Sequence, residues 1–258
     1  IILLHSSKTM RRSTGEHNRL RPPLLLEKAR QLDAYLKTLT PAQLAKTMSL
    51  SPALAEKTHS LIAAWTAEPA DQSPAIDSFI GDIYSGLHAN VLPPADRDYA
   101  DETLRILSGL YGILRPYDGI CPYRPEMGYK LPDPAFASLY AFWGESIAAS
   151  LPKDGPIVNL AAAEYAQAVT RYVDSSRIIS PKFLTVNFKT GEPDFVVVHA
   201  KIARGAFARW MIIHRIQQVT ALEQFAELGY HFAEDLSAPG SPTFVCETFA
   251  GKGLSIRL

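Results

Sequence analysis

Residues 1–9 read Ile1-Ile2-Leu3-Leu4-His5-Ser6-Ser7-Lys8-Thr9, four apolar side chains followed at once by five polar ones. A short, continuous apolar run of this kind is typical of a buried strand. The polar residues behind it predict a loop at the end of that strand, a common position for functional side chains. Lys8 is the candidate binding residue of this loop, because a lysine ammonium can hold a phosphate as a compact charge. The alternative is an ordinary surface lysine.

Beyond this strand, the N-terminal half is predicted to be largely helical. Thr40-Pro41 and Ser51-Pro52 each combine an N-cap residue with a proline at the first helical position. The expected helices cover residues 24–39, 41–48, 52–65 and 97–111. Residues 112–134 contain five of the nineteen prolines and are expected to form a long irregular segment with a functional role.

The C-terminal half mixes both kinds of element. The expected strands cover residues 156–160, 178–179, 183–188, 195–198, 230–232 and 243–247. The expected helices cover residues 136–150, 161–173, 200–217 and 220–228. Because the elements alternate without a regular βαβ rhythm or an internal repeat, we expect an α+β fold with a single compact domain over residues 1–258.

The composition of the 258 residues is that of a core-forming globular protein, with 47% apolar and 20% charged side chains. These values argue against a disordered chain, a fibre or a coiled coil. No uncharged apolar stretch reaches the roughly 18 residues of a membrane-spanning helix, and the run at residues 1–4 is too short for a signal peptide. Two cysteines, Cys121 and Cys246, cannot build a disulfide framework. We therefore expect a cytoplasmic protein without a membrane partner.

The net charge of zero hides an uneven distribution along the chain. Residues 1–50 carry nine Lys and Arg against three Asp and Glu, whereas residues 51–100 carry two against seven. Residues 177–215 are again basic, with seven against two. If the two basic tracts meet in space, they form a surface that attracts anions. The alternative, and from charge alone the better one, is solvated charge scattered over the surface.

Known catalytic and cofactor motifs are absent from the sequence. There is no phosphate-binding P-loop, no dinucleotide fingerprint, no nucleophile elbow, and no CxxC or HExxH pair. We therefore expect no cofactor and no metal site. A mononuclear site using His5, His199 or His231 stays open as an alternative.

Two further polar groups are candidates for a binding site. Asp82 and Tyr84 lie in a segment bounded by Gly81 and Gly86, where the alternatives are a helix cap for Asp82 and a core position for Tyr84. The second group follows the helix predicted to end near residue 111 and is fixed by prolines. Its members are Tyr111, Arg115, Tyr123, Arg124 and Glu126. An Arg–carboxylate pair that merely rigidifies this loop is at least as good an explanation as a binding site.

Seven sequence blocks, in order, resemble the YaaA family of bacterial peroxide-stress proteins over essentially the whole chain. These blocks are LHSSKTM, GDIYSGL, LSGLYGILRPYD, PYRPEMG, LYAFW, IVNLAAAEY and KIARGAFARWMI. The chain departs from the family pattern at two places. The usual opening resembles SPAKT, and here it reads His5-Ser6-Ser7-Lys8-Thr9. A block resembling NLASxEY lacks its serine in residues 159–165.

The resemblance implies a cytosolic protein that protects against hydrogen peroxide, limits free iron and binds DNA. It also implies an α+β fold with a positively charged cleft and a helix-hairpin-helix element. The closest match to that element is Thr40–Trp65, in which the turn Ser49-Leu50-Ser51 lacks the usual glycines that let a phosphate approach the backbone. The segment 109–112 is a second candidate turn.

We therefore expect a protein that binds DNA, duplex or structured, largely independently of sequence. No helix presents an Arg, Asn and Gln array for reading bases. The cations expected to neutralise phosphates are Lys8, Arg11, Arg12, Lys201, Arg204 and Arg209. Tyr84, Tyr111 and Tyr123 would stack on an unpaired base.

The alternative function is an enzyme of unknown reaction that acts on a nucleotide or another anionic substrate in the same cleft. Lys8, Asp82, Arg124 and Glu126 would suit acid–base chemistry there. Direct iron binding is the weakest hypothesis, because the potential ligands are not suitably spaced. A broad basic groove would favour DNA, and an enclosed pocket with convergent Asp82 and Glu126 would favour an enzyme. We also expect Lys8 to share a cleft with the Arg124–Glu126 loop, bordered by the basic edge of a helix over residues 201–216.

Overall fold

A five-stranded sheet forms the centre of the molecule, and β1 (Ile2–His5) is its middle strand. The computed structural model describes residues 1–13, 19–68 and 72–254. The strand order is β6-β5-β1-β8-β9. The neighbours of β1 are β5 (Leu104–Ser108) and β8 (Ile157–Asn159), and the two edge strands are β6 (Gly112–Leu114) and β9 (Ile178–Ile179). Because β1 runs parallel to both β5 and β8, the ends of all three strands meet at one edge of the sheet.

The helix predicted over residues 97–111 is wrong in its second half. Helix α6 (Pro94–Thr103) ends before the apolar residues, and β5 follows directly. Strand β5 pairs with β1 so that Leu4 faces Ile106 and His5 faces Leu107. A short apolar run is compatible with both a buried helix and a buried strand. Here the edge of β1 is available for pairing, and hydrogen bonding to it stabilises the strand.

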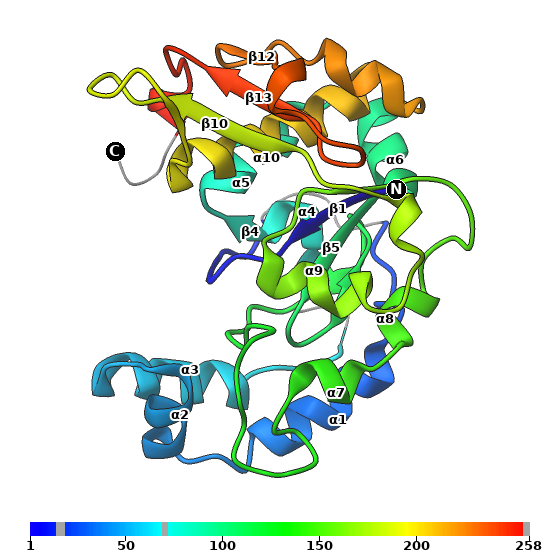
Figure 1. Ribbon diagram of the computed structural model, residues 1–258. Helices are drawn as coiled ribbons and strands as arrows, with labels where there is room; N and C mark the ends of the chain where they lie inside the picture. Colours follow the sequence, from blue (N-terminus) through cyan, green and yellow to red (C-terminus); the bar gives the residue numbers. More distant parts are fainter. Residues whose placement is uncertain (14–18, 69–71, 255–258) are drawn as a thin grey trace.

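A second sheet packs against the long helix α10 (Val197–Ile213). Its strand order is β11-β10-β13-β12, and Figure 1 shows it on the far side of α10 from α5. The strands are β10 (Lys182–Val186), β11 (Pro193–Asp194), β12 (Tyr230–Phe232) and β13 (Thr243–Cys246). The partner strand predicted over residues 195–198 is wrong, because the hairpin closes earlier and α10 begins at Val197. A cluster of aromatic rings from Phe183, Phe207 and Phe244 joins this sheet to α10.

Helices α10 and α5 (Asp82–Leu87) touch along their backbones. A Cβ atom added to Gly205 would lie 1.8 Å from the Ile83 carbonyl oxygen, and one added to Gly86 would lie 2.0 Å from the Ile202 carbonyl oxygen. Both glycines are therefore required for the close approach. This contact sets the distance between two walls of the pocket described below.

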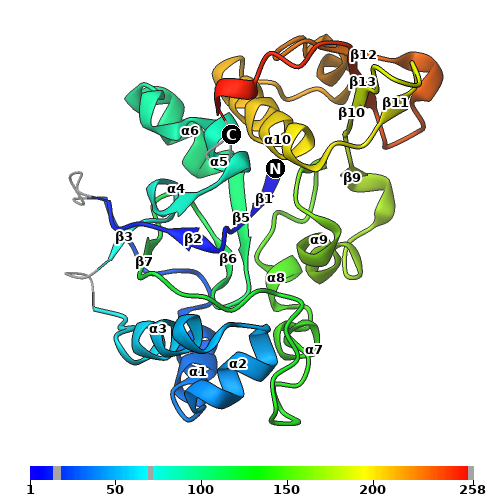
Figure 2. The ribbon, with the colours of Figure 1, turned by 90° about the vertical axis from the view of Figure 1, so that its left-hand side faces the viewer.

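The predicted helix starts at Thr40 and Ser51 are confirmed. Thr40 caps α2 (Pro41–Met48) in a reciprocal capping box with Gln43, and Ser51 caps α3 (Pro52–Ala63). With α1 (Leu26–Leu36), these helices lie at the opposite end of the molecule from α10, as both ribbon views show (Figures 1 and 2). Helices α2 and α3 pack against each other, and the α2–α3 turn places Ser49 in the left-handed conformation, with φ 52°.

Short elements connect these parts. They are β2 (Thr9–Met10), β3 (Ser73–Pro74), α4 (Ala75–Ser78), β4 (Phe79–Ile80), β7 (Gly119–Ile120), α7 (Leu139–Trp143), α8 (Ser146–Ala149) and α9 (Ala163–Thr170). The helix predicted over residues 136–150 is two helices, because Gly144 adopts a φ of 51° between them. The helix predicted over residues 220–228 is a shorter 3₁₀ turn, Val219–Gln224.

Buried apolar side chains from both sheets belong to one continuous cluster, which extends from Leu3 in β1 to Phe244 in β13. The α+β class is confirmed, with a largely parallel central sheet that the sequence pattern did not indicate. Within the described residues, no helix combines the length and apolarity needed to cross a membrane.

Candidate functional site

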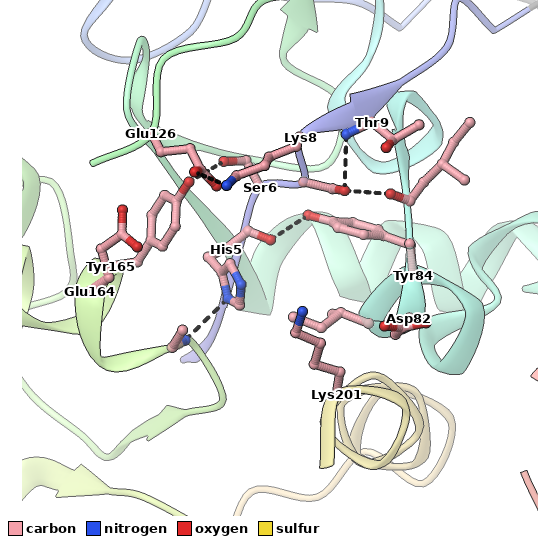
Figure 3. Close-up of a pocket in the computed structure, with 15 residues that line it drawn as sticks. His5, Ser6, Lys8, Thr9, Asp82, Tyr84, Glu126, Glu164, Tyr165 and Lys201 are labelled. Carbon is pink, nitrogen blue, oxygen red and sulfur yellow. Dashed lines mark hydrogen bonds and ion pairs between the residues drawn. The ribbon is translucent and has the colours of Figure 1, made fainter. Parts of the chain in front are cut away.

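A pocket of about 440 Å³ opens where β1 ends (Figure 3). Its position agrees with the general rule that ligands bind at the carboxyl ends of parallel strands. Segments distant in sequence form its walls: the β1 end and its loop, the start of α5, the loop at Glu126, the start of α9, and α10. The lining residues are His5, Ser6, Ser7, Lys8, Thr9, Ile80, Gly81, Asp82, Ile83, Tyr84, Glu126, Ala162, Glu164, Tyr165 and Lys201.

Lys8 and Glu126 meet in this pocket, as predicted. The Lys8 ammonium lies 2.7 Å from the Glu126 carboxylate. The Lys8 side chain is 55% exposed and that of Glu126 is 16% exposed, so the pair spans the pocket mouth. Arg124, two residues away, does not line the pocket, and its buried Nε finds no hydrogen-bond partner among the described residues.

His5 is fixed in the pocket wall by two contacts. The backbone N–H of Ala162 donates to His5 Nδ1 at 3.1 Å, and the imidazole stacks on Tyr165 with ring centroids 4.8 Å apart. Burial, followed by the positive charges of Arg204 and Lys201, lowers the pKa of His5 to about 3. The ring is therefore neutral at physiological pH. Because Nδ1 accepts a hydrogen bond, the proton of the neutral ring resides on Nε2.

The loop that carries Lys8 is held against the start of α5. Ser7 Oγ donates to the Ile80 carbonyl oxygen and accepts from the Thr9 backbone N–H. The neighbouring Gly81 has a φ of 145°, and a Cβ there would approach Ser7 Oγ to 3.1 Å. The serine and the glycine thus fix the direction in which Lys8 leaves the end of β1.

The three tyrosines expected to stack on a base are buried, and this expectation is wrong. Tyr111 is fully buried, and its hydroxyl accepts from the Trp65 indole and the Cys121 backbone N–H. Tyr123 accepts from Ser108 Oγ, and Tyr84 donates to the His5 carbonyl oxygen. Tyr84 reaches the pocket only with part of its surface. Their hydroxyls find partners inside the protein, which lets the rings serve as core.

Of the predicted basic helix edge, Lys201 lines the pocket, whereas Arg204 is not a lining residue and lies near enough to His5 to act on its charge. Figure 3 shows the Lys201 side chain extending from α10 toward His5. Arg204 follows one turn later, half-buried, and burial lowers its pKa. Among the residues the structure describes, neither cation forms an ion pair. Arg209 lies on another side of α10, where it pairs with Glu227 at 2.7 Å, and it does not line the pocket.

The two basic tracts do not join into one basic face, because carboxylates neutralise much of the first one. Ion pairs connect Arg19 with Asp98 in the acidic tract and Arg21 with Asp101 directly after it, so this part of the basic tract binds carboxylates. The predicted cleft residue Arg115 pairs with Asp118 at 2.8 Å. Arg11 donates to the Asp77 carbonyl oxygen.

Arg12 is exposed near the end of β2 and has an interaction partner of its own. Asp82, Glu126 and Glu164 add three carboxylates to the pocket. The described residues therefore present a compact pocket of mixed charge.

Sequence reasoning missed Glu164 and Tyr165 and considered His5 only as a metal ligand. Glu164 accepts a hydrogen bond of 2.8 Å from the Gly128 backbone N–H. These residues follow β1 and β8, so the parallel pairing of the two strands would have brought them together in a topology prediction. Across the described segments, no three His, Cys, Asp or Glu side chains gather as metal ligands.

Comparisons with known proteins match the sequence of this chain over nearly its full length. A family model described as "Peroxide stress protein YaaA" matches residues 1–236. A UPF0246 protein from Salinispora tropica is 59% identical over 257 residues, which cover 100% of this chain and 98% of that protein. A UPF0246 protein from Burkholderia mallei is 38% identical over 262 residues, covering 97% of this chain and 99% of that protein.

Proposed function

Because this chain belongs to the YaaA family of peroxide stress proteins, we propose that it binds DNA largely independently of sequence. In this proposal it thereby helps to limit iron-dependent oxidative damage. The carrying observation is two cations on α10, Lys201 in the pocket wall and Arg204 one turn later, neither of which forms an ion pair within the described chain. Cations held without a carboxylate partner are available to neutralise phosphates.

The expected contacts are to the DNA backbone. Lys201 and Arg204 lie one turn apart on α10, so their two side chains can reach adjacent phosphates. Lys8 adds a third positive group, reduced by its ion pair with Glu126. Backbone contacts position a protein on DNA without reading its sequence. A protein bound in this way would also cover the DNA against oxidants formed from iron and peroxide.

The α2–α3 turn is not part of the proposed surface. The backbone N–H groups of Ser49 and Leu50 both donate to the Ala45 carbonyl oxygen. A helix-hairpin-helix motif binds phosphate through backbone N–H groups that are free to donate. Here two of the three turn residues already use theirs inside the chain, and the turn contains no glycine.

A second candidate function is an enzyme that acts on a nucleotide or another anionic substrate. The compact pocket, with Asp82 and Glu126 on its walls and Lys8 paired to Glu126, favours it. A carboxylate and an ammonium in contact can exchange a proton with a bound substrate. Mass spectrometry of DNA and nucleotides after incubation tests this function. Turnover that Glu126→Gln abolishes while binding persists would support it, and unchanged substrates would count against it.

The main proposal is tested by mobility-shift titrations at two salt concentrations. Lys201→Ala and Arg204→Ala should each weaken binding to duplex, bulged and single-stranded DNA of any sequence. Each should also reduce the slope of log affinity against log salt by about one unit. Arg209→Ala is the matched control, because Arg209 lies on the same helix and already pairs with Glu227. Unchanged affinity and slope in both pocket variants would reject this surface, and a loss confined to one sequence would indicate base reading.

A further inference from the structure

We propose that His5, Lys201 and Arg204 form a subsite for one phosphate group, with neutral His5 donating a hydrogen bond to a phosphate oxygen. This proposal rests on the proposed function, in which the phosphate belongs to a DNA backbone. It adds which residues hold that phosphate. Three groups of different chemistry on two elements carry it: a neutral donor on β1 and two cations on α10.

The donor is the Nε2–H group of His5. His5 is only 9% exposed and lines the pocket. Its Nδ1 is occupied by the Ala162 N–H, and its face is covered by Tyr165. Among the described residues, no group accepts a hydrogen bond from Nε2, and this atom is not one of the fully buried polar atoms, so it is accessible from the pocket. The opening beside this donor is the pocket itself, and a ligand oxygen there would satisfy it.

The two cations supply the charge. Arg204 and Lys201 lie close enough to His5 to oppose its protonation. The same positive field that keeps a proton off His5 attracts an anion to the place beside it. An ammonium and a planar guanidinium together bind phosphate as a point charge and as a fork of donors.

The start of α9 adds a favourable field to the same wall. Its N-cap residue is Ala162, which has no side chain able to cap the helix. The N–H groups of Ala162 and Tyr165 already donate within the chain, and those of Ala163 and Glu164 between them have no described acceptor, so the partial positive charge of this helix start favours an anion. Ala162 and His5 both line the pocket, so helix start and imidazole face the same space.

Carboxylates border this subsite as well. Glu126 is neutralised by Lys8, whereas Glu164, in the first turn of α9, accepts a hydrogen bond from the Gly128 N–H and keeps its negative charge. Asp82, at the start of α5, has interactions of its own. A ligand whose phosphate group binds at the α10 wall would therefore place its uncharged part, with any hydrogen-bond donors, near Glu126 and Tyr165.

The test is a titration of the full chain with inorganic phosphate alone, followed by calorimetry and by the backbone amide resonance of Ala162. Saturable binding is expected to shift that resonance, because the Ala162 N–H bonds the ring that binds the ion. Lys201→Met, Arg204→Met and His5→Gln should each weaken binding about tenfold, as expected for a lost hydrogen bond to a charged group. Arg209→Met removes the same charge from the same helix and should leave the affinity unchanged.

If Arg209→Met weakened phosphate binding as much as the other variants, the attraction would be general electrostatics and the subsite would be refuted. Phosphate binding that leaves the Ala162 resonance unshifted would also refute it. If His5→Gln does not fold, the Ala162 resonance of the native chain still decides the role of His5. Mobility shifts separate the two proposals. DNA binding without phosphate binding at this site refutes the subsite alone, and phosphate binding without DNA binding refutes the proposed function alone.

Discussion

His5 links the pocket to the stability of the fold. In the unfolded chain an imidazole titrates near its ordinary pKa of 6.5, whereas burial and the nearby Arg204 and Lys201 lower the pKa of folded His5 to about 3. Below about pH 6.5 His5 is therefore protonated in the unfolded chain but stays unprotonated in the folded chain. The stabilising contribution is complete above pH 6.5 and is lost as the pH falls toward 3.

We therefore expect the free energy of unfolding to decrease between pH 7.5 and 5.5, with a His5 contribution of at most about 1.4 kcal/mol per pH unit. Urea unfolding at the two pH values measures it. His5→Gln removes this titration and should show a shallower pH dependence, while the other histidines contribute equally to both proteins. Identical pH dependence in the two proteins would show that His5 takes up its proton while folded.

Ala162 is a second residue whose identity has an energetic effect. It occupies the N-cap of α9 with φ −66° and ψ 152°, a conformation typical of a capping residue, yet its methyl group accepts no hydrogen bond. It also stands at the serine position of the motif that residues 159–165 resemble.

Replacing Ala162 by Ser should raise the free energy of unfolding by about 1 kcal/mol, because a hydroxyl can accept from the first helical N–H groups. Thermal or urea denaturation measures the change. Ala163→Ser is the matched control, since that exposed position lies inside the helix, where a hydroxyl cannot cap it. Equal effects of both substitutions would contradict a capping role.

At the scale of elements, the contact between α5 and α10 determines the shape of the pocket. Asp82 and Lys201 lie on opposite sides of this contact, each within the first turns of its helix. The backbones approach so closely that neither Gly86 nor Gly205 has room for a methyl group. The distance between two pocket walls is thus fixed by two residues that do not line the pocket.

Gly205→Ala should lower the free energy of unfolding by at least about 1–3 kcal/mol, because the helices must separate to admit the Cβ atom. It should also weaken ligand binding, although no ligand-contacting side chain changes. Denaturant unfolding and the phosphate titration measure the two effects. Gly253→Ala, which introduces a methyl group into open space, is the control. A stable Gly205→Ala protein with native affinity would show that the helices have freedom to separate.

At the scale of the whole molecule, one continuous apolar core connects the central sheet, the second sheet and the helices at the opposite end. Trp65 and Trp143 belong to the part with α1–α3 and α7, and Trp210 belongs to α10. Because no gap divides the core, both parts should unfold in a single transition. Urea unfolding followed by the fluorescence of single-tryptophan variants measures this. Different midpoints for Trp65 and Trp210 would reveal two independently stable parts.

The charges are also organised at this scale. Arg19, Arg21 and their partners Asp98 and Asp101 turn an apparently basic N-terminal tract into a network of ion pairs. The cations left for a ligand come from α10, more than 170 residues later than these arginines in the sequence. A tract's net charge therefore did not predict the electrostatic character of the pocket.

The sequence by itself determined the elements whose signals are local. The apolar run at residues 1–4 formed the expected strand, which extends to His5, Thr40 and Ser51 capped the expected helices, and the residues around 201–213 formed a helix with Lys201 and Arg204 along one edge. Each of these depends on side chains within a few positions of one another, through capping, proline geometry or helical periodicity. The sequence also predicted that Lys8 and the loop of Glu126 share one cleft, because a strand end and a proline-fixed loop hold them in place, whereas the ion pair between the two side chains was not predicted.

Only the tertiary structure decided the rest. Leu104–Ser108 became a strand because β1 offered it an edge, and the tyrosines at 84, 111 and 123 became core because their hydroxyls found partners far away in the chain. His5 became neutral through burial, and the N–H of Ala162, 157 residues distant, leaves its remaining proton on Nε2. Such effects depend on which segments meet after folding. Hydrogen bonding, burial and neighbouring charge arise from these tertiary contacts, and no local sequence pattern predicts them.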